Sequence, residues 1–352
     1  MSGGVDSAVA ALLLKQQKYH VEAVFMKNWQ QDDDDEYCST QQDLIDAQKV
    51  CEVLNIPLHT VNFAAEYWDK VFQHFLDEYA AMRTPNPDVL CNKEIKFRAF
   101  LDYAKNLGAD KIATGHYARH TTTTNTTNKE HLLKGLDPTK DQSYFLYLLS
   151  QEQLAPSMFP LGDLLKTEVR RIAEEAKLPN HAKKDSTGIC FIGERKFKTF
   201  LSQYLLAKPG DITTTEGIIL GKHTGLMFYT IGQRQGLNIG GQKNAAESPW
   251  YVAAKDTTNN HLIVTQDRNH PSLSAKKLTC DQIHWISGEA PVMPFNCSAK
   301  IRYRQQDQEC VVQKFNNNEL LVEFSAPQWA ITPGQSIVFY QQDECLGGGI
   351  VI

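Results

Sequence analysis

The sequence contains 352 residues, of which 42% are hydrophobic and 22% charged, and it carries a formal net charge of −5 at pH 7. This length predicts two or three domains with ample hydrophobic core, and the mildly acidic charge does not by itself indicate a nucleic-acid-binding protein. No segment approaches the roughly 18 apolar residues of a membrane span, and the N-terminus lacks the layout of a signal peptide, so we expect a cytoplasmic protein with no membrane partner.

The eight cysteines argue against a disulfide framework, because thiols stay reduced in the cytosol. No two of them form a Cys-x-x-Cys pair, which argues against a zinc ribbon and against a thioredoxin-type site. The spacing of the cysteines therefore predicts no metal site.

The chain opens on a glycine-rich loop that leads directly into the apolar helical run AVAALLL. The loop consists of Ser2, Gly3, Gly4, Val5, Asp6 and Ser7. Glycine amides, serine hydroxyls and the N-terminal end of a helix together suit a bound phosphate, and Asp6 is a candidate for placing a magnesium ion. The lysine of a Walker loop is missing, and a simple Gly-Gly helix entry is the alternative interpretation.

The first two hundred residues alternate between strand-like and helix-like patterns. Apolar runs of strand length lie at 21–26, 58–63 and 111–115, and residues with helical spacing lie at 44–54, 68–79 and 97–104. This alternation predicts a parallel sheet covered by helices, with ligands at the carboxyl ends of the strands. Gly115 and His116 follow the third run and are expected at the same edge as the glycine-rich loop. The aromatic stripe at 68–79 is interpreted as core.

The segment TPNPDVLCNKEIKF at 84–97 carries a candidate nucleophile. Its two prolines favour an extended turn, and Asn92 is expected to cap the helix that follows. This interpretation places Cys91 at a helix N-terminus, where the thiolate is favoured, and makes Asp88 a candidate acid or base. The alternative is a buried structural cysteine.

The segment KDSTGICFIGERKF at 184–197 carries a second candidate, Cys190, within a locally basic stretch. A basic stretch is also compatible with an ordinary solvated face. Two loop cysteines far apart in the sequence, beside a nucleotide-type loop, suggest sulfur chemistry more than metal binding. The other six cysteines lie in segments better interpreted as ordinary structure.

The pattern changes near residue 200, where glycine-punctuated strands begin, and alternating strands of a barrel type follow from about Ser272. We predict a catalytic domain at 1–200, a small central domain at 201–270 and an all-β barrel at 271–352. The low-complexity run at 121–129 is expected to be a hairpin tip, and the three asparagines at 316–318 a turn between two strands.

Along the chain occur, in this order, the motifs SGGVDS, TPNPDVLCNKEIKF, ATGHYAR, KDQSYFLY, KDSTGICFIGERKF, GLMFYTIGQRQGL, RYRQ and TPGQSIVFY. Taken together, these motifs resemble those of the bacterial tRNA-specific 2-thiouridylases, a family of PP-loop ATP-pyrophosphatases. The resemblance implies an α/β parallel-sheet domain of the adenine-nucleotide alpha hydrolase type, a small central domain and a C-terminal β-barrel that contacts tRNA.

The resemblance also implies a reaction. ATP, with Mg²⁺, adenylates the C2 oxygen of the wobble uridine, and sulfur from a cysteine persulfide then displaces AMP to give 2-thiouridine. The implied substrates are the tRNAs for Lys, Glu and Gln, and the implied sulfur donor is a carrier protein of a cysteine-desulfurase relay.

Roles for individual residues follow from the resemblance position by position. Cys190 resembles the persulfide-bearing cysteine, and Cys91 resembles the partner thiol that releases the sulfur through a transient Cys91–Cys190 disulfide. Asp88, with Asn86 and Pro87, resembles the segment that meets the target base. The ATP site is implied at the loop Ser2–Ser7, Met26 and Gly115. The implied tRNA contacts are His116, Lys140, Asp141, Gln142, Arg302, Tyr303 and Gln335.

Three alternatives remain open. Other ATP-pyrophosphatases adenylate a different substrate, and a relative with a vestigial loop would bind RNA without catalysis. Asp88, Cys91 and Cys190 together are also a possible ligand set for an iron–sulfur cluster, although their spacing is not the usual one for such sites.

Members of the family carry a short apolar strand before the loop, whereas this sequence starts at the loop. A central strand of a parallel sheet is costly to remove. We therefore expect that upstream codons encode this strand, and that an extended form binds ATP more tightly and is more stable. Equal melting temperatures and equal ATP affinities for the two forms would contradict this expectation.

Overall fold

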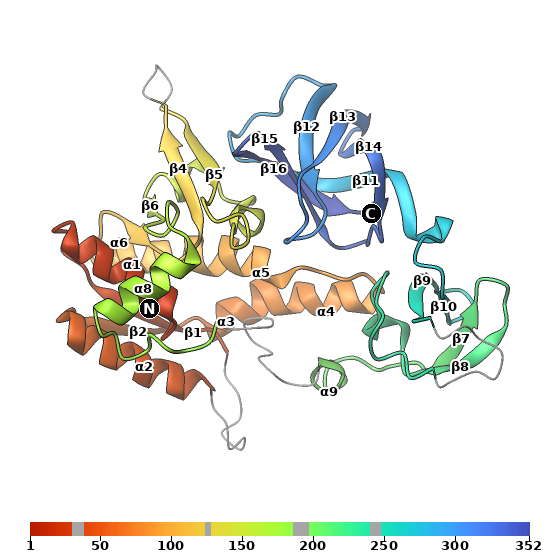
Figure 1. The fold of residues 1–352 in the computed structure, drawn as a ribbon, viewed down its shortest axis with the longest axis horizontal. Coiled ribbons are helices and arrows are strands. Elements are labelled where there is room, and N and C mark those ends of the chain that lie inside the picture. The colour runs from red at the N-terminus through yellow and green to blue at the C-terminus, as the bar shows by residue number, and fades with distance from the viewer. Residues whose placement is uncertain (30–38, 124–127, 186–196, 240–247) are drawn as a thin grey trace.

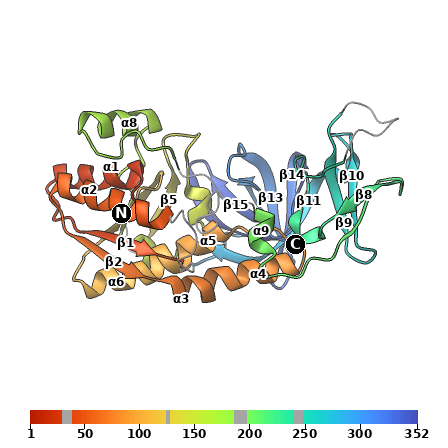
Figure 2. The ribbon, with the colours of Figure 1, turned by 90° about the horizontal axis from the view of Figure 1, so that it is seen from below.

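The computed structural model describes residues 1–29, 39–123, 128–185, 197–239 and 248–352. Figure 1 shows the N-terminal α/β part at one end of the molecule and the C-terminal barrel and the small central sheet at the other. In both views α4 extends from the α/β part towards the central sheet (Figures 1 and 2). Among the described helices, none has both the length and the apolar character needed to cross a bilayer.

The α/β part contains the predicted parallel strands. β1 (Ala23–Lys27) pairs with β2 (Leu58–Asn62) in parallel, and β3 (Ile112–Ala113) pairs in parallel with β6 (Ser157–Met158). These two pairs are separate sheets in the described chain. The opening loop adjoins both pairs, because the Met1 amino group donates to the Val24 carbonyl, 2.5 Å away, and Gly115 lies against the backbone of Asp6 and Ser7.

Helices cover these strands. They are α1 (Val5–Gln16), α2 (Ser39–Leu54), α7 (Gln151–Leu154), α8 (Lys166–Glu175) and two long helices with π-type turns. The first long helix joins α3 (Ala64–Tyr67) to α4 (Gln73–Ala80) through Trp68–Phe72. The second joins α5 (Pro87–Leu90) to α6 (Phe100–Asn106) through Cys91–Ala99. The predicted aromatic stripe is confirmed as core at Phe72, Phe75 and Tyr79, which are buried, but not at Trp68, which is 40% exposed at the start of the stripe.

The central part is a small sheet that shares this core. It consists of β7 (Gly210–Thr214), β8 (Ile219–His223), β9 (Tyr251–Asp256) and β10 (His261–Thr265), in the order β8-β7-β10-β9. Phe228 and Leu262 belong to the same hydrophobic cluster as Phe72, Phe75 and Phe200, the last of these in α9 (Phe197–Leu201). The central part is therefore packed on the first long helix.

The C-terminal part is a closed antiparallel barrel. Its described strands are β11 (Ser274–Trp285), β12 (Phe295–Lys300), β13 (Gln308–Asn316), β14 (Glu319–Trp329), β15 (Ser336–Gln341) and β16 (Glu344–Val351). They follow the order β11-β14-β13-β12-β15-β16, and a β11–β16 pairing closes the barrel. Closure leaves no open sheet edge within the barrel.

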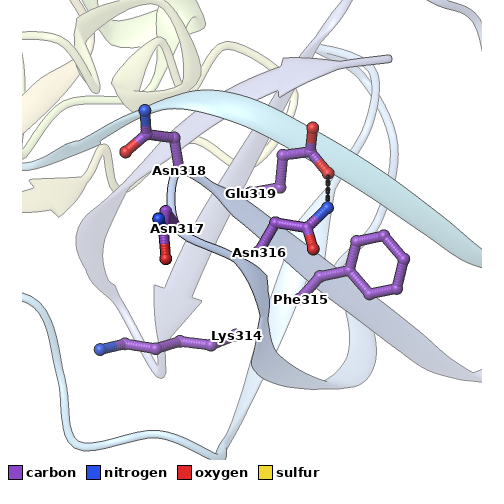
Figure 3. Close-up of a pocket in the computed structure, with 6 residues that line it drawn as sticks. All are labelled: Lys314, Phe315, Asn316, Asn317, Asn318 and Glu319. Carbon is purple, nitrogen blue, oxygen red and sulfur yellow. Dashed lines mark hydrogen bonds between the residues drawn. The ribbon is translucent and has the colours of Figure 1, made fainter.

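The predicted turn at 316–318 is confirmed between β13 and β14 (Figure 3). The Asn316 side-chain amide donates to a Glu319 carboxylate oxygen at 2.9 Å and so closes the turn. A surface hollow at this hairpin tip is lined by residues 314–319, and none of the predicted site residues lies among them.

The hairpin predicted around 121–129 is confirmed as β4 (Ala118–Thr122) and β5 (Glu130–Lys134), and it has an unexpected role. β5 pairs with β16 of the barrel, with Leu133 opposite Glu344 and Leu132 opposite Cys345. A hairpin of the α/β part therefore extends the sheet of the barrel and fixes the two parts against each other.

Candidate active site

The glycine-rich loop is folded on itself by its two serines. The Ser2 N–H donates to Ser7 Oγ at 3.1 Å, the two hydroxyl oxygens lie 3.2 Å apart, and Ser7 Oγ donates to the Gly4 carbonyl at 3.1 Å. Gly3 has a φ of 73°, and a Cβ there would lie 2.4 Å from the Asp43 carbonyl oxygen, so only glycine suits this position. Val5 then begins α1, which places the helix N-terminus at the loop.

Asp6 is held by a lysine and a tyrosine from distant parts of the chain. Lys166 Nζ lies 2.7 and 2.9 Å from the two carboxylate oxygens of Asp6, and Tyr117 Oη donates to Asp6 Oδ1 at 2.9 Å. Lys166 is the first residue of α8 and is buried. The loop that has no lysine of its own therefore has an ammonium group beside it, supplied by another helix.

Asp185 extends this network. It accepts from Lys140 at 2.8 Å, Lys166 at 2.9 Å and Arg170 at 2.7 Å. Partial burial opposes ionisation of the carboxyl, but hydrogen bonds from Lys140 and Lys166 outweigh it and lower the pKa of Asp185 to about 2. A chain of charges thus joins Asp6 of the loop to Lys140, a predicted tRNA contact.

The lowered pKa of Asp185 predicts a pH dependence of stability. The ordinary pKa is 3.8 and the folded-state pKa is about 2, so ionised Asp185 stabilises the fold fully above pH 3.8 and loses this contribution as the pH falls to about 2. Asp185→Asn is expected to lower the free energy of unfolding at pH 7, with a smaller difference from wild type at pH 3. Urea unfolding at pH 7, 4 and 3 measures this difference. A difference that grows towards low pH would contradict it.

Gly115 and His116 lie between the loop and the helix that carries Cys91. A Cβ on Gly115 would lie 2.9 Å from Asp6 C and from Ser7 N, so glycine is required for this close approach. The His116 ring packs against Phe97 with centroids 5.7 Å apart. Burial holds the pKa of His116 well below its ordinary value of 6.5, so the ring is neutral at pH 7.

The helix in the segment 84–97 begins earlier than predicted. The placement of Cys91 at a helix N-terminus is wrong, because α5 starts at Pro87, four residues before it. Proline is preorganised for the first helical position, and the effect of a helix end falls off within one turn. The predicted cap by Asn92 is also wrong, since its side-chain amide donates instead to the Phe145 carbonyl at 3.1 Å. Cys91 is fully buried and Asp88 is partly buried.

Cys190 lies outside the described residues, as does most of the basic stretch around it. Among the described cysteines, Cys51, Cys280, Cys297, Cys310 and Cys345 are free thiols. Burial raises the pKa of Cys280 to about 12 and also raises that of Cys345, so both thiols stay protonated at pH 7. No cluster of three or more potential metal-ligating side chains occurs in the described parts of the chain.

The predicted tRNA contacts fall into separate groups. Tyr303 Oη donates to the Lys140 carbonyl at 3.2 Å, and the Tyr303 ring lies 4.4 Å from that of Phe145, so Lys140 and Tyr303 are neighbours. Arg302 donates to the Ala330 carbonyl at 2.9 Å. These side chains are partly buried and have partners within the protein.

Three other predicted contacts point into the molecule. Asp141 is buried, accepts from the Gly135 and Ser143 N–H groups at 3.1 Å, and lies 3.3 Å from Lys300 Nζ. Gln142 accepts from the Tyr117 N–H at 3.0 Å. Gln335 donates to the carbonyls of residues 84 and 85. Their roles towards tRNA stay predictions.

Comparison with known proteins identifies the family. Family models match residues 1–194 ("tRNA methyl transferase HUP domain"), 198–266 ("tRNA methyl transferase PRC-barrel domain") and 275–351 ("Aminomethyltransferase beta-barrel domain"). The chain is 60% identical to the tRNA-specific 2-thiouridylase MnmA of Methylococcus capsulatus, covering 100% of this chain and 94% of that protein. It is also 60% identical to the protein of the same name from Francisella philomiragia, of which it covers 98%. The chain belongs to this family.

Membership in the 2-thiouridylase family confirms the resemblance and the fold class predicted from the motifs. The sequence had not indicated Lys166, Tyr117 or Asp185 as site residues. Asp6 and Lys166 are 160 positions apart, and no spacing pattern connects them. The signal for Lys166 was a lysine at the start of an amphipathic helix, which is common at surfaces. Tyr117 and Asp185 lie within the motifs ATGHYAR and KDSTGICFIGERKF, which drew attention to other residues.

Proposed function

We propose that this protein is a tRNA-uridine 2-sulfurtransferase that uses ATP to replace the C2 oxygen of the wobble uridine with sulfur. The observation that carries the proposal is the position of Gly115 and His116. Gly115 lies against the phosphate-type loop, and His116 lies against Phe97 of the helix that carries Cys91. The proposed nucleotide loop and the helix that carries Cys91 are thereby linked through two consecutive residues, which supports a reaction that joins adenylation to sulfur transfer. End-to-end similarity to proteins named tRNA-specific 2-thiouridylase supports the same conclusion.

ATP is assigned to the loop Ser2–Ser7 together with Met26 and Gly115. Loop amides and the N-terminus of α1 suit the phosphates, and Lys166 adds a positive charge beside them. Asp6 is the proposed carboxylate for Mg²⁺, an ion commonly held by one or two carboxylates together with substrate phosphates. Lys166 Nζ lies 2.7 and 2.9 Å from its two oxygens, so Asp6 would hold the ion only after Lys166 gives up one of them. When bound, the ion neutralises charge on the phosphate groups.

The chemistry is proposed in two stages. The uridine C2 oxygen attacks the α-phosphorus of ATP, and pyrophosphate leaves. The terminal sulfur of a Cys190 persulfide then attacks C2, and AMP leaves with the former C2 oxygen. Attack by the Cys91 thiolate on Cys190 Sγ breaks the remaining sulfur–sulfur bond, which gives 2-thiouridine and a Cys91–Cys190 disulfide that an external thiol reduces.

The proposed partners follow from this chemistry. A carrier protein with a persulfide, charged by a cysteine desulfurase, supplies sulfur to Cys190. The RNA substrate is a tRNA with a wobble uridine, of the Lys, Glu and Gln type. A wobble base must leave its stack to reach a buried thiol such as Cys91, so recognition should rely on shape, stacking and phosphate contacts.

The test is nucleoside mass spectrometry of total tRNA from cells depleted of this protein. We expect loss of 2-thiolated wobble uridines while other modifications remain. Unchanged 2-thiouridine would refute the proposed function. With purified protein, tRNA-dependent release of AMP separates a sulfurtransferase from a non-catalytic RNA-binding relative, and formation of 2-thiouridine separates it from other ATP-pyrophosphatases.

A further inference from the structure

Residues 82–85, which we call the linker, connect α4 to the helix of Asp88 and Cys91 and are held from the central part. Lys255 Nζ of β9 donates to the Met82 carbonyl at 2.8 Å, and the hydroxyl oxygens of Thr84 and Thr230 lie 3.2 Å apart. Both contacts join sequence positions more than 140 residues apart. The central part therefore fixes the beginning and the middle of the linker.

The barrel holds the other end of the linker. The Thr84 N–H donates to the Pro333 carbonyl at 3.0 Å, and Gln335 Nε2 donates to the Thr84 carbonyl at 2.7 Å and to the Pro85 carbonyl at 3.3 Å. Gly334 has a φ of 89°, and a Cβ there would lie 2.9 Å from Thr84 N. Backbone of the barrel thus lies directly against backbone of the linker.

The linker is stiff between these contacts and the chemistry. Pro85 and Pro87 have restricted φ angles, and the residue before each proline is restricted as well. Pro85 and Pro87 are both buried, and Pro87 is the first residue of the helix that carries Asp88 and Cys91. The two prolines therefore limit how far a displacement at Pro85 can be absorbed before it reaches Asp88 and Cys91.

We propose that Gln335 is a positioning residue for the reaction, which fixes Asp88 and Cys91 through its two hydrogen bonds to the linker. The inference rests on the proposed function. It gives the barrel a part in the chemical step in addition to tRNA binding. Because the side-chain N–H groups of Gln335 are directed at the linker carbonyls, they are not available to a phosphate in this arrangement.

The test compares Gln335→Met with Gln328→Met. Each variant replaces a barrel glutamine by an uncharged side chain of similar length. Gln328 is a matched control because it is buried and its side chain bonds within the barrel, to Gln308 and the Ala326 carbonyl, and not to the linker. For Gln335→Met we expect single-turnover formation of 2-thiouridine to slow by about 10- to 100-fold, as a small misplacement of reacting groups does. The KM for tRNA and the affinity for ATP should stay within about twofold of wild type.

Labelling of the native protein with an alkylating reagent gives a second readout that does not depend on activity. Since Cys91 is fully buried, its alkylation is expected to be faster in Gln335→Met than in wild type and in Gln328→Met. A raised KM for tRNA with an unchanged rate would overturn the inference and make Gln335 a tRNA contact. Equal effects of Gln335→Met and Gln328→Met on the rate and on the labelling would mean that Gln335 only stabilises the barrel, which would also overturn the inference. Failure of the wild-type protein to make 2-thiouridine would refute the proposed function. Labelling of Cys91 at the same rate in Gln335→Met as in wild type would overturn the inference about Gln335, whatever the outcome for the proposed function.

Discussion

Cys190→Ser is expected to abolish formation of 2-thiouridine, with a loss of at least about 10³-fold, while tRNA-dependent release of pyrophosphate continues and AMP stays attached to the uridine C2 oxygen. Serine cannot carry the persulfide, whereas adenylation depends on the loop and the uridine. The measurement is a single-turnover reaction with ATP, tRNA and a persulfide donor, in which 2-thiouridine, pyrophosphate and AMP are quantified in the same samples.

Cys91→Ser distinguishes the proposed role of Cys91 from that of Cys190. We expect it to lose thiolation to a similar extent but still to accept a persulfide on Cys190. With ATP and tRNA present, the sulfur should then be trapped in a Cys190–S–S–C2 adduct with the tRNA, because the step that is blocked follows both sulfur loading and attack on C2. Cys297→Ser is the control, since Cys297 is a partly buried free thiol in the barrel and has no role in the reaction. Thiolation by Cys190→Ser at the wild-type rate would contradict the persulfide route.

The same variants address the iron–sulfur alternative. A cluster held by Asp88, Cys91 and Cys190 would bring iron and acid-labile sulfide in the anaerobically purified wild type, and Cys190→Ser would lose both. The persulfide route predicts wild-type protein that is active without iron. Iron that accompanies activity through purification would favour the cluster.

The features that the sequence predicted correctly are those that depend on a local pattern of residues. The helical aromatic stripe at 68–79, the strands at 58–63 and 111–115 and the asparagine turn all appear in the structure, because periodicity and turn chemistry act over a few residues. The start of the Cys91 helix was predicted too late, since Pro87 was interpreted as part of a turn although it also suits a first helical position.

The contacts between distant parts of the chain were not predicted, for a physical reason. The pairing of Asp6 with Lys166, of Gln335 with Thr84 and of β5 with β16 depends on how the domains pack, and single-sequence periodicity carries no information on packing. These contacts join the site to the rest of the molecule. The motifs therefore indicated candidate reacting residues, and the packing shows which side chains contact Asp6 of the loop and the linker before Asp88 and Cys91.

Gly115→Ala is expected to weaken ATP binding strongly, because an added Cβ would lie 2.9 Å from Asp6 C and Ser7 N. Both neighbours are backbone atoms of the phosphate-type loop, so the loop itself must move. Such overpacking typically costs about 1–3 kcal/mol. If this cost falls on the ATP-bound conformation, the affinity decreases by about 5- to 150-fold.

Titration calorimetry with ATP measures the change in affinity, and Gly221→Ala in β8 is the matched control. A Cβ on Gly221 would meet nothing within 4 Å, so this variant should bind ATP as wild type does. Melting temperatures of both variants separate a local effect from a loss of fold. Wild-type ATP affinity in Gly115→Ala would mean that the loop tolerates the displacement and that ATP is bound elsewhere. A weakened affinity at a near-normal melting temperature would instead place the nucleotide where Gly115 meets the loop, because the three atoms nearest to the added methyl group all belong to Asp6 and Ser7.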